Sequence, residues 1–268
     1  MTPARAARIA LCGETDAGTA QTAGPTFAGD PAPHGSARYT VTPGGEYARR
    51  VDAADPLPDR PAPDNPQGKL VLLRHGETEW SRTGRHTGRT DVPLTEHGEE
   101  LARAAGELVR GYDFRLVLTS PLQRARRTAE LAGLDAEIDP QLIEWDYGGY
   151  EGRTTQDIRA ELGYNWSAFT HGVIRGETPG ETVEEVAARA SRVLTRVFPA
   201  MVDGDVALVA HGHYLRILAA VFLRQAPRFG ASITFGAGSV SVLGYDREQP
   251  AILAWNHGPQ LPLEPPRS

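Results

Sequence analysis

From residue 69 onward, apolar residues follow two kinds of pattern. Short continuous apolar runs at 69–73, 115–119 and 205–210 predict buried parallel strands, which are covered on both faces. Between these runs, apolar residues recur at helical spacing over 95–110 and 181–198. Strands that alternate with helices predict an α/β fold, a three-layer α/β/α sandwich with a mainly parallel central sheet. One face of the helix over 95–110 is expected to carry Leu101, Ala104, Ala105, Leu108 and Val109.

Local signals predict the ends of further elements. Ser120 and Pro121 are typical of an N-cap followed by a first-turn proline, so we expect a helix from there to about residue 132. Thr154 and Asp157 have the spacing of a capping box and predict a helix over 154–162. A helix over 214–223 and a hairpin of strands 239–245 and 251–255 complete a domain that we place at 67–260, with a flexible C-terminus over 261–268.

The first 66 residues have a different composition. They hold 10 of the 21 prolines and few large aliphatic side chains. Burying so little apolar surface does not offset the entropy lost on ordering a chain. We therefore predict a disordered Pro/Ala/Gly-rich tail and linker over 1–66, with a small folded domain as the alternative.

Charge and cysteine content exclude several classes of protein. With 28 basic and 34 acidic residues, a net charge of −6 and Lys69 as the only lysine, the chain lacks a generally basic surface for nucleic acid. Cys12 is the only cysteine, which excludes an intrachain disulfide and a cysteine-based metal site. No apolar run approaches the roughly 18 residues of a membrane span, and the N-terminus lacks a signal-peptide core. We expect a soluble cytoplasmic protein that binds neither nucleic acid nor membrane, and we leave a homodimer open.

Charged side chains follow three of the predicted strands. The first strand runs into Arg74 and His75, the second reaches Arg124, and the third ends at His211 and His213. The carboxyl ends of parallel strands share one edge, and arginine forks suit an anion with several oxygens, such as phosphate. His211 and His213 also suggest a metal pair, but no carboxylate or further histidine has supporting spacing. We predict an anion site without a metal or cofactor.

Five segments resemble those of the histidine phosphatase superfamily, also called phosphoglycerate-mutase-like. They occur in the family's order, span about 69–258, and are similar to the acid-phosphatase and sugar-bisphosphatase-like branch. The segments are LRHGET at 73–78, GRTDVPLTEHG at 88–98, SPLQRARRTA at 120–129, EWDYGGYEG at 144–152 and AHG at 210–212.

The resemblance implies a role for each matching residue. His75 is the expected nucleophile and forms a phosphohistidine, while Arg74 and Arg124 bind the phosphoryl oxygens and a cationic His211 donates to the same group. Glu144 is the expected acid and base, which requires a pKa raised by burial, with Trp145 and Tyr147 as an apolar wall. His75 needs a neighbour that fixes its tautomer. The expected substrate-binding residues are Arg74, Ser81, Thr87, Gly88, Arg124, His211 and Gly212.

Departures from the family pattern favour hydrolysis. Ser81 stands where many members carry asparagine, and its shorter side chain still donates one hydrogen bond. Cofactor-dependent mutases usually carry Arg-His-Tyr-Gly where this chain has residues 145–148, and also a Lys/Arg-rich insertion. We expect a metal-independent phosphomonoesterase that acts on small phosphorylated metabolites, sugar phosphates among them. The alternatives are a phosphoglycerate mutase and a non-catalytic pseudoenzyme that binds phosphorylated ligands.

Several residues near these segments have other expected roles. We place His213 outside catalysis and expect Arg216 to form a structural salt bridge. His86, Thr87 and Arg89 lie in the loop after the nucleophile, where they can contact the non-phosphate part of the substrate.

Overall fold

The structure is a computed structural model that describes residues 39–41, 47–49 and 67–258, in two units divided near residue 60. In the first unit, β1 (Tyr39–Val41) pairs antiparallel with β2 (Tyr47–Arg49). The sequence analysis predicted no strand here, although aromatic and β-branched residues favour extended chain. The rest of the predicted tail over 1–66 and residues 259–268 lie outside the described part.

The second unit is built on a six-stranded sheet of order β5-β4-β6-β3-β7-β8. Its first four strands run parallel, while β7 pairs antiparallel with β3 and β8 pairs antiparallel with β7. The mainly parallel sheet and the closing hairpin are therefore confirmed. The strands are β3 (Leu70–Arg74), β4 (Phe114–Thr119), β5 (Glu137–Ile138), β6 (Asp205–Ala210), β7 (Val240–Asp246) and β8 (Gln249–His257).

Ten helical segments of the described chain connect these strands. The α-helices are α1 (Glu79–Arg82), α2 (Glu96–Val109), α3 (Gln123–Leu131), α4 (Thr155–Leu162), α5 (Ala168–His171), α6 (Val183–Asp203) and α7 (Gly212–Phe222). Short 3-10 turns occupy η1 (Pro140–Leu142), η2 (Gly148–Tyr150) and η3 (Pro227–Ser232).

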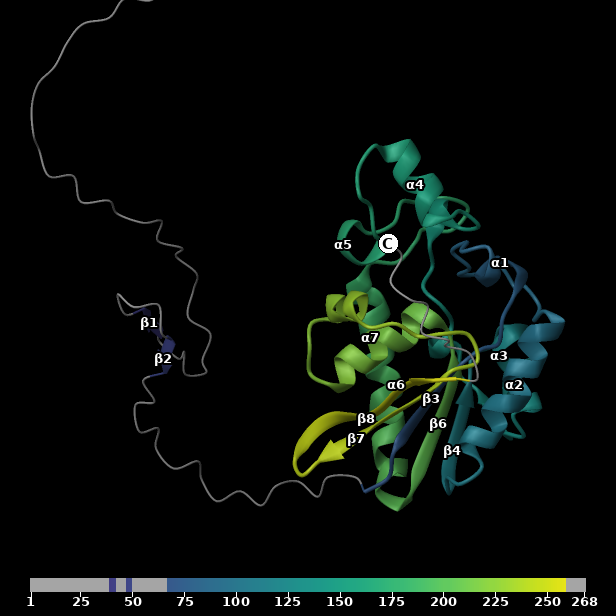
Figure 1. The fold of residues 1–268 in the computed structure, drawn as a ribbon, viewed down its shortest axis with the longest axis vertical. Helices are drawn as coiled ribbons and strands as arrows, with labels where there is room; N and C mark the ends of the chain where they lie inside the picture. The colour runs from purple at the N-terminus through teal and green to yellow at the C-terminus, as the bar shows by residue number, and fades with distance from the viewer. Residues whose placement is uncertain (1–38, 42–46, 50–66, 259–268) are drawn as a thin grey trace, which may run out of the picture. The chain divides into compact units, whose positions relative to one another are not determined.

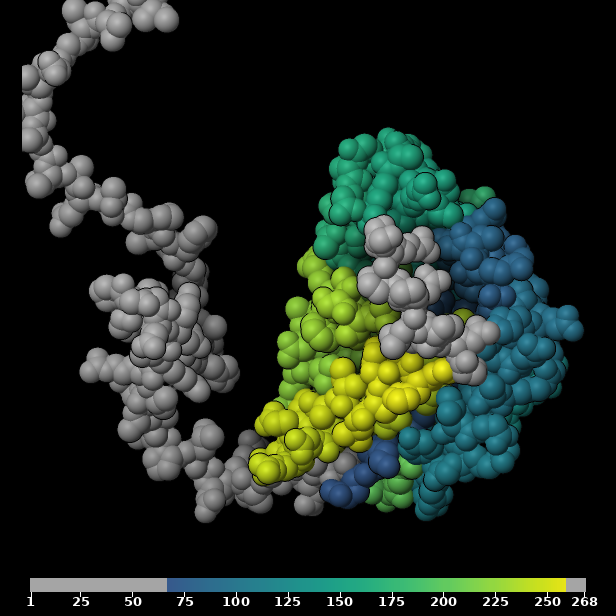
Figure 2. Space-filling model, in the orientation of Figure 1, coloured from purple at the N-terminus to yellow at the C-terminus, as the bar shows by residue number. Residues whose placement is uncertain are grey.

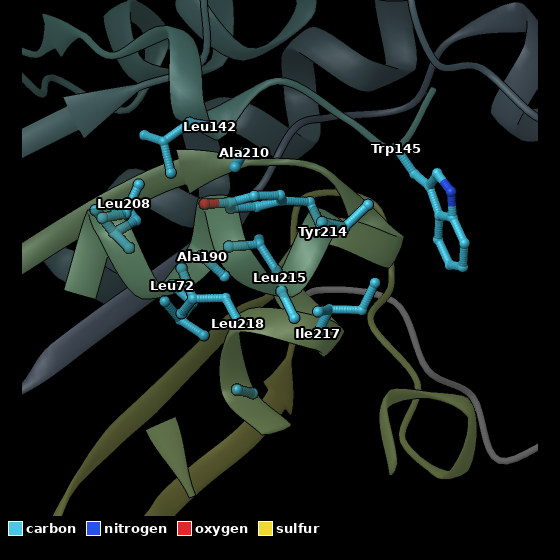
Figure 3. Packing of buried hydrophobic residues seen from close by; sticks show 14 of the residues in the cluster. Leu72, Leu142, Trp145, Ala190, Leu208, Ala210, Tyr214, Leu215, Ile217 and Leu218 are labelled. Carbon is cyan, nitrogen blue, oxygen red and sulfur yellow. The ribbon is translucent and has the colours of Figure 1, made fainter. Parts of the chain in front are cut away.

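Alternate residues of the central strands pack into two separate cores. On β3, Val71 and Leu73 join the buried residues of α2 and α3. Leu70 and Leu72 point to the other face and join α6 and α7, where Leu208 and Leu218 contribute to the same cluster (Figure 3). Helices cover both faces of the sheet (Figure 1), which confirms the three-layer sandwich.

Threonine side chains cap the starts of two helices, α2 and α4. Thr95 accepts a hydrogen bond from the Gly98 N–H and caps α2, and Thr154 forms the predicted capping box with Asp157 at α4. The predicted apolar face of α2 is wrong at Leu108, which is 44% exposed. The buried stripe runs instead through Leu101, Ala102, Ala105 and Val109, so Ala102 is buried and Leu108 is not.

Three other helix ends differ from the sequence prediction. Ser120 is not an N-cap, because its amide still bonds to Val209 of β6 and its hydroxyl bonds to His211; α3 starts at Gln123 with Leu122 as its cap. The helix predicted over 181–198 begins at Val183 and continues through Pro199 to Asp203. The helix predicted from residue 214 begins at Gly212, with His211 in the N-cap position.

The segment between η1 and α6, which includes η2, α4 and α5, lies at one end of the sheet (Figure 1) and forms the teal top of the second unit in Figure 2. Backbone hydrogen bonds connect it to the loop that follows α1. In one of them, the Gly152 N–H donates to the His86 carbonyl oxygen at 2.8 Å. This segment and that loop both supply residues that line a cavity at the carboxyl ends of β3 and β6. Within the described residues, no helix is long and apolar enough to cross a bilayer.

Candidate active site

A cavity of about 250 Å³ opens at the carboxyl ends of β3 and β6. These strands are neighbours, with Arg74 paired to Ala210. The side chains expected from both strand ends therefore reach one place, as the topology of parallel sheets requires. The cavity is lined by Arg74, His75, Ser81, Gly84, Arg85, His86, Thr87, Glu144, Tyr147, Thr155, Gly212, His213, Arg216 and Phe235.

His75 presents a nitrogen that carries no proton. Its Nδ1 lies 2.7 Å from the Gly76 carbonyl oxygen, which only accepts hydrogen bonds, so Nδ1 holds the proton and Nε2 holds a lone pair. Burial, followed by the charges of Arg124 and Arg74, lowers the pKa of His75 well below its usual 6.5. The ring is therefore neutral near pH 7, in the tautomer that a nitrogen nucleophile needs.

Arg74 supplies the cation beside His75. One of its terminal nitrogens donates to the Phe235 carbonyl, while Nε is buried without a hydrogen-bond partner in the described structure. A Cβ on Gly212 would lie 3.1 Å from the guanidinium carbon, so the glycine lets helix α7 begin directly against Arg74. A buried N–H without a partner is costly unless a ligand oxygen accepts from it.

Arg124 is fully buried behind the cavity rather than lining it. It donates to the carbonyl oxygens of Thr87, Gly88 and Thr90, and its Nε donates to His211 Nδ1 at 3.2 Å. Arg124 thereby fastens the loop 87–90 to α3 and orients His211.

His211 is neutral in this geometry, which corrects the expected cationic ring. Its Nδ1 accepts from Arg124, so the proton lies on Nε2, 2.7 Å from the Ser120 hydroxyl oxygen. Burial and then Arg124 lower its pKa well below 6.5, because a cation beside an imidazole opposes protonation. The rings of His211 and His75 are 5.1 Å apart at their centroids. Arg124 fixes this tautomer, because a guanidinium only donates, and Ser120, which the sequence suggested only as a helix cap, accepts the Nε2 proton.

Glu144 lies at the N-terminus of α7. Its carboxylate accepts three backbone N–H groups, from Trp145 at 2.8 Å, His213 at 3.1 Å and Tyr214 at 2.8 Å. Burial raises the pKa of Glu144, against the opposing effect of these hydrogen bonds and of Arg124. The raised pKa agrees in direction with the requirement for a general acid. Tyr147 lines the cavity beside it, whereas Trp145 is buried behind and does not.

A buried ion pair that the sequence analysis missed holds the Glu144 segment. Arg189 of α6 pairs with Glu181 at 2.7 Å and donates to the carbonyl oxygens of Gln141 and Ile143. Glu181 in turn accepts from the Asp146 amide and, through its own carbonyl, from the Trp145 indole. The signal was present in the sequence, because Arg189 interrupts the apolar stripe of α6 between Val186 and Ala190.

Three further ring side chains line the cavity, namely Tyr147, His86 and His213. The Tyr147 hydroxyl and His213 Nδ1 are 2.7 Å apart, and His86 Nε2 is 3.2 Å from the Thr155 hydroxyl. Burial lowers the pKa of His86 to about 4, so its ring is neutral. We call Arg74, His75 and Glu144, with Arg124 and His211 behind them, the catalytic floor. We call His86, Thr155, His213 and Arg216 the outer wall.

The other predicted substrate-binding residues divide into two groups. Ser81 and Thr87 line the cavity, but the Ser81 hydroxyl is also part of the capping box with Thr78 that starts α1. Gly88 does not line it, and its amide donates to Glu151 at 2.9 Å. Arg89 lies 3.8 Å from the Asp146 carboxylate and is also not a lining residue.

Arg216 differs from its expected role. The structure gives it no salt bridge among the described residues; it donates to the carbonyl oxygens of Gly230 and Ala231 and lies over the Phe169 ring, 4.7 Å from its centre. It lines the cavity instead. The sequence could not show this, because η3 folds back on α7 only in the tertiary structure.

The catalytic floor combines a nitrogen lone pair, a neighbouring cation and a buried carboxyl group. This set can carry out transfer of a phosphoryl group to nitrogen, with a proton given to the departing oxygen. Within the described residues, no group of three His, Cys, Asp or Glu side chains is placed to hold a metal ion.

Comparison with known proteins agrees with this chemistry. A family model described as histidine phosphatase superfamily (branch 1) matches residues 70–258. An acid phosphatase of Mycobacterium tuberculosis is 39% identical over 72% of this chain and 95% of its own length. A sedoheptulose 1,7-bisphosphatase of Saccharomyces cerevisiae is 33% identical over 58% of this chain and 67% of its own, and a probable phosphoglycerate mutase of Erwinia tasmaniensis is 34% identical over 58% and 74%.

A solved structure of an open reading frame from Mycobacterium tuberculosis matches with a TM-score of 0.68 and 35% identity, covering 72% of this chain and 98% of that one. The range matched by the family model, 70–258, includes every member of the catalytic floor. The names of these relatives support phosphatase or mutase activity. The chain is an enzyme that belongs to the histidine phosphatase superfamily.

Proposed function

We propose that this enzyme is a phosphomonoesterase that hydrolyses small phosphorylated metabolites through a phosphohistidine on Nε2 of His75, without a metal ion. The observation that carries the proposal is the hydrogen bond from His75 Nδ1 to the Gly76 carbonyl. It leaves Nε2 as a lone pair inside a cavity that also holds Arg74 and Glu144.

In the first step, the Nε2 lone pair of His75 attacks phosphorus in line with the ester bond. The P–O bond to the leaving group breaks, and the protonated Glu144 carboxyl gives its proton to the departing oxygen. Burial favours the protonated form of Glu144 that this step requires.

In the second step, water attacks the phosphorus and the P–N bond to His75 breaks. Glu144, now ionised, takes a proton from that water, so inorganic phosphate leaves and both residues return to their starting states. The three N–H groups that bind the Glu144 carboxylate stabilise it between the two steps.

Charge neutralisation is assigned to Arg74, Arg124 and His211. Arg74 has a buried Nε without a partner in the described structure, which suits a phosphoryl oxygen. Arg124 and His211 bind each other and neighbouring groups, and contact with the phosphoryl group replaces some of these partners with stronger, charged acceptors. A phosphate dianion also raises the pKa of His211, which favours the donor form expected from the sequence.

The cavity favours hydrolysis over isomerisation. Its volume of about 250 Å³ suits a small metabolite. The chain's single lysine, Lys69, is not a lining residue, and Glu144 is followed by Trp-Asp-Tyr-Gly at 145–148 rather than by the Arg-His-Tyr-Gly of cofactor-dependent mutases. With 3-phosphoglycerate and bisphosphoglycerate present, we expect phosphate release; production of 2-phosphoglycerate at a comparable rate would assign the enzyme to the mutases instead.

The test is capture of the phosphoenzyme on the purified full chain. We expect a base-stable, acid-labile phosphoryl group on the wild type after rapid quenching with labelled substrate, and steady hydrolysis of 4-nitrophenyl phosphate in excess EDTA. His75→Ala is expected to lose the label and at least about 10⁴-fold in kcat, as for other covalent nucleophiles. His97→Ala, on the exposed start of α2, is the control. Labelling of His75→Ala, or activity lost in EDTA and restored by a divalent ion, would contradict the proposal.

A further inference from the structure

Arginines outnumber carboxylates along the cavity. Arg74, Arg85 and Arg216 line it, and Glu144 is the only carboxylate among the lining residues. Under the proposed function, the first of these arginines is used at the phosphoryl group. Arg216 stands on the outer wall and has no role in the two chemical steps.

Arg216 is held in place and still has hydrogen-bonding capacity. Its Nε donates to the Gly230 carbonyl at 2.7 Å and Nη2 to the Ala231 carbonyl at 3.2 Å, and the guanidinium lies over the Phe169 ring, 4.7 Å from its centre. Among the described residues, Nη1 has no hydrogen bond and the side chain has no ion pair with a carboxylate. A half-buried cation without an ion-pair partner suits an anionic ligand.

His213 adds a second donor beside it. His213 and Arg216 are three residues apart on α7 and so share a face of the helix, and the His213 ring also packs on Phe169, at 4.9 Å. When the Tyr147 hydroxyl donates to His213 Nδ1 across their 2.7 Å contact, the ring proton lies on Nε2 and His213 can donate from that nitrogen. Both side chains line the cavity, and both are fixed by the same phenyl ring.

We infer that Arg216 and His213 bind a second oxyanion of the substrate, a carboxylate or a second phosphoryl group, while His75 receives the first phosphoryl group. This inference rests on the proposed function and narrows its substrate class to small phosphate esters that carry a second negative group. The paired donors, the support from Phe169 and the absence of an ion pair at Arg216 among the described residues all lead to the same ligand chemistry.

The experiment compares substrates that differ only in the second group. Glycerol 3-phosphate against 3-phosphoglycerate tests a carboxylate, and fructose 6-phosphate against fructose 1,6-bisphosphate tests a second phosphoryl group. For the wild type, we expect kcat/KM to be at least about tenfold higher for the doubly charged member of one pair or both, since a hydrogen-bonded charge is typically worth that factor. Ratios near one in both pairs would overturn the inference.

Three variants then assign the preference to Arg216. In Arg216→Gln we expect the ratio to fall roughly 10- to 100-fold, because the charged donor is lost. Arg216→Lys keeps the charge and should give an intermediate ratio. Arg110→Gln, at an exposed arginine of α2 that is 74% accessible, should leave the ratio at its wild-type value.

The ratio is measured within each variant, so partial misfolding lowers both members of a pair equally and does not imitate loss of specificity. An unchanged ratio in Arg216→Gln would overturn the inference, and so would a Lys variant no better than the Gln variant, which would assign the effect to packing on Phe169. Failure of the wild type to hydrolyse 4-nitrophenyl phosphate would instead refute the proposed function itself.

Discussion

The catalytic floor and the outer wall of the cavity are built in different ways. The floor takes its side chains from the ends of β3 and β6, from α3 and from the loop after η1, and each is held by hydrogen bonds to backbone or to another floor residue. The outer wall takes its side chains from the loop after α1, from α4 and from α7. It combines side-chain contacts, such as His86 on Thr155 and Arg216 on Phe169 of α5, with hydrogen bonds from Arg216 to two carbonyl groups of η3. Under the proposed function, the scaffold positions the reacting groups, while we expect substrate selection to lie with outer-wall side chains that can be exchanged without rebuilding the sheet.

Among the changes that leave the nucleophile in place, the largest effect is expected from removing the proton donor of the floor. Glu144→Gln keeps the shape of the side chain but cannot give or take the proton, so kcat for an alkyl phosphate should fall about 10²–10⁴-fold. The loss should be smaller for 4-nitrophenyl phosphate, whose leaving group departs without a proton. Equal losses for the two substrates would remove Glu144 from the role of general acid.

The pH profile of kcat/KM sharpens the same test. Activity requires a neutral His75, whose pKa lies well below 6.5, so the rate should fall only at pH values below that lowered pKa. It also requires a protonated Glu144, whose pKa burial raises above its usual 4.5, so the rate should fall again as the pH rises through this raised pKa. In Glu144→Gln the decline on the alkaline side should disappear.

A smaller effect is expected from the support of the floor. Arg189→Met removes one partner of a buried ion pair and leaves Glu181 with its longer pair to Arg89 at 3.7 Å, which should lower the free energy of unfolding by up to roughly 3–5 kcal/mol. Because Arg189 also binds the carbonyls before Glu144, kcat should fall with KM little changed. Urea unfolding and steady-state kinetics measure the two effects, with the exposed Arg192→Met of the same helix as control. A stability equal to that of the control would show that the ion pair does not hold this segment.

The smallest effect is expected from removing the N-cap of α4. Thr154→Ala removes the side chain that caps α4, the helix that carries Thr155, and should cost about 1 kcal/mol of stability. The catalytic floor does not depend on this helix, so kcat for 4-nitrophenyl phosphate should change by less than about twofold. A large loss of kcat would show that floor and wall are coupled more tightly than their contacts indicate.

The sequence predicted the sheet, most of the helices and the residues of the floor. Continuous apolar runs located β3, β4 and β6, and the topology of parallel strands then brought Arg74, His75 and His211 to one edge. The capping box of Thr154 and Asp157 was correct because its hydrogen bonds are local. Ser120 was misread because a serine before proline has the same local signal whether its hydroxyl caps a helix or binds a histidine 91 residues away.

What the sequence determined by itself is therefore the periodic part of the fold and the choice of candidate reacting groups, since both depend on near neighbours or on strand order. Only the tertiary structure decided the protonation of His211, the burial of Arg124, the Arg189–Glu181 support and the position of Arg216 in the cavity. Each of these depends on burial and on charges or carbonyl groups from distant segments, and no local pattern in the chain encodes which distant group will come into contact.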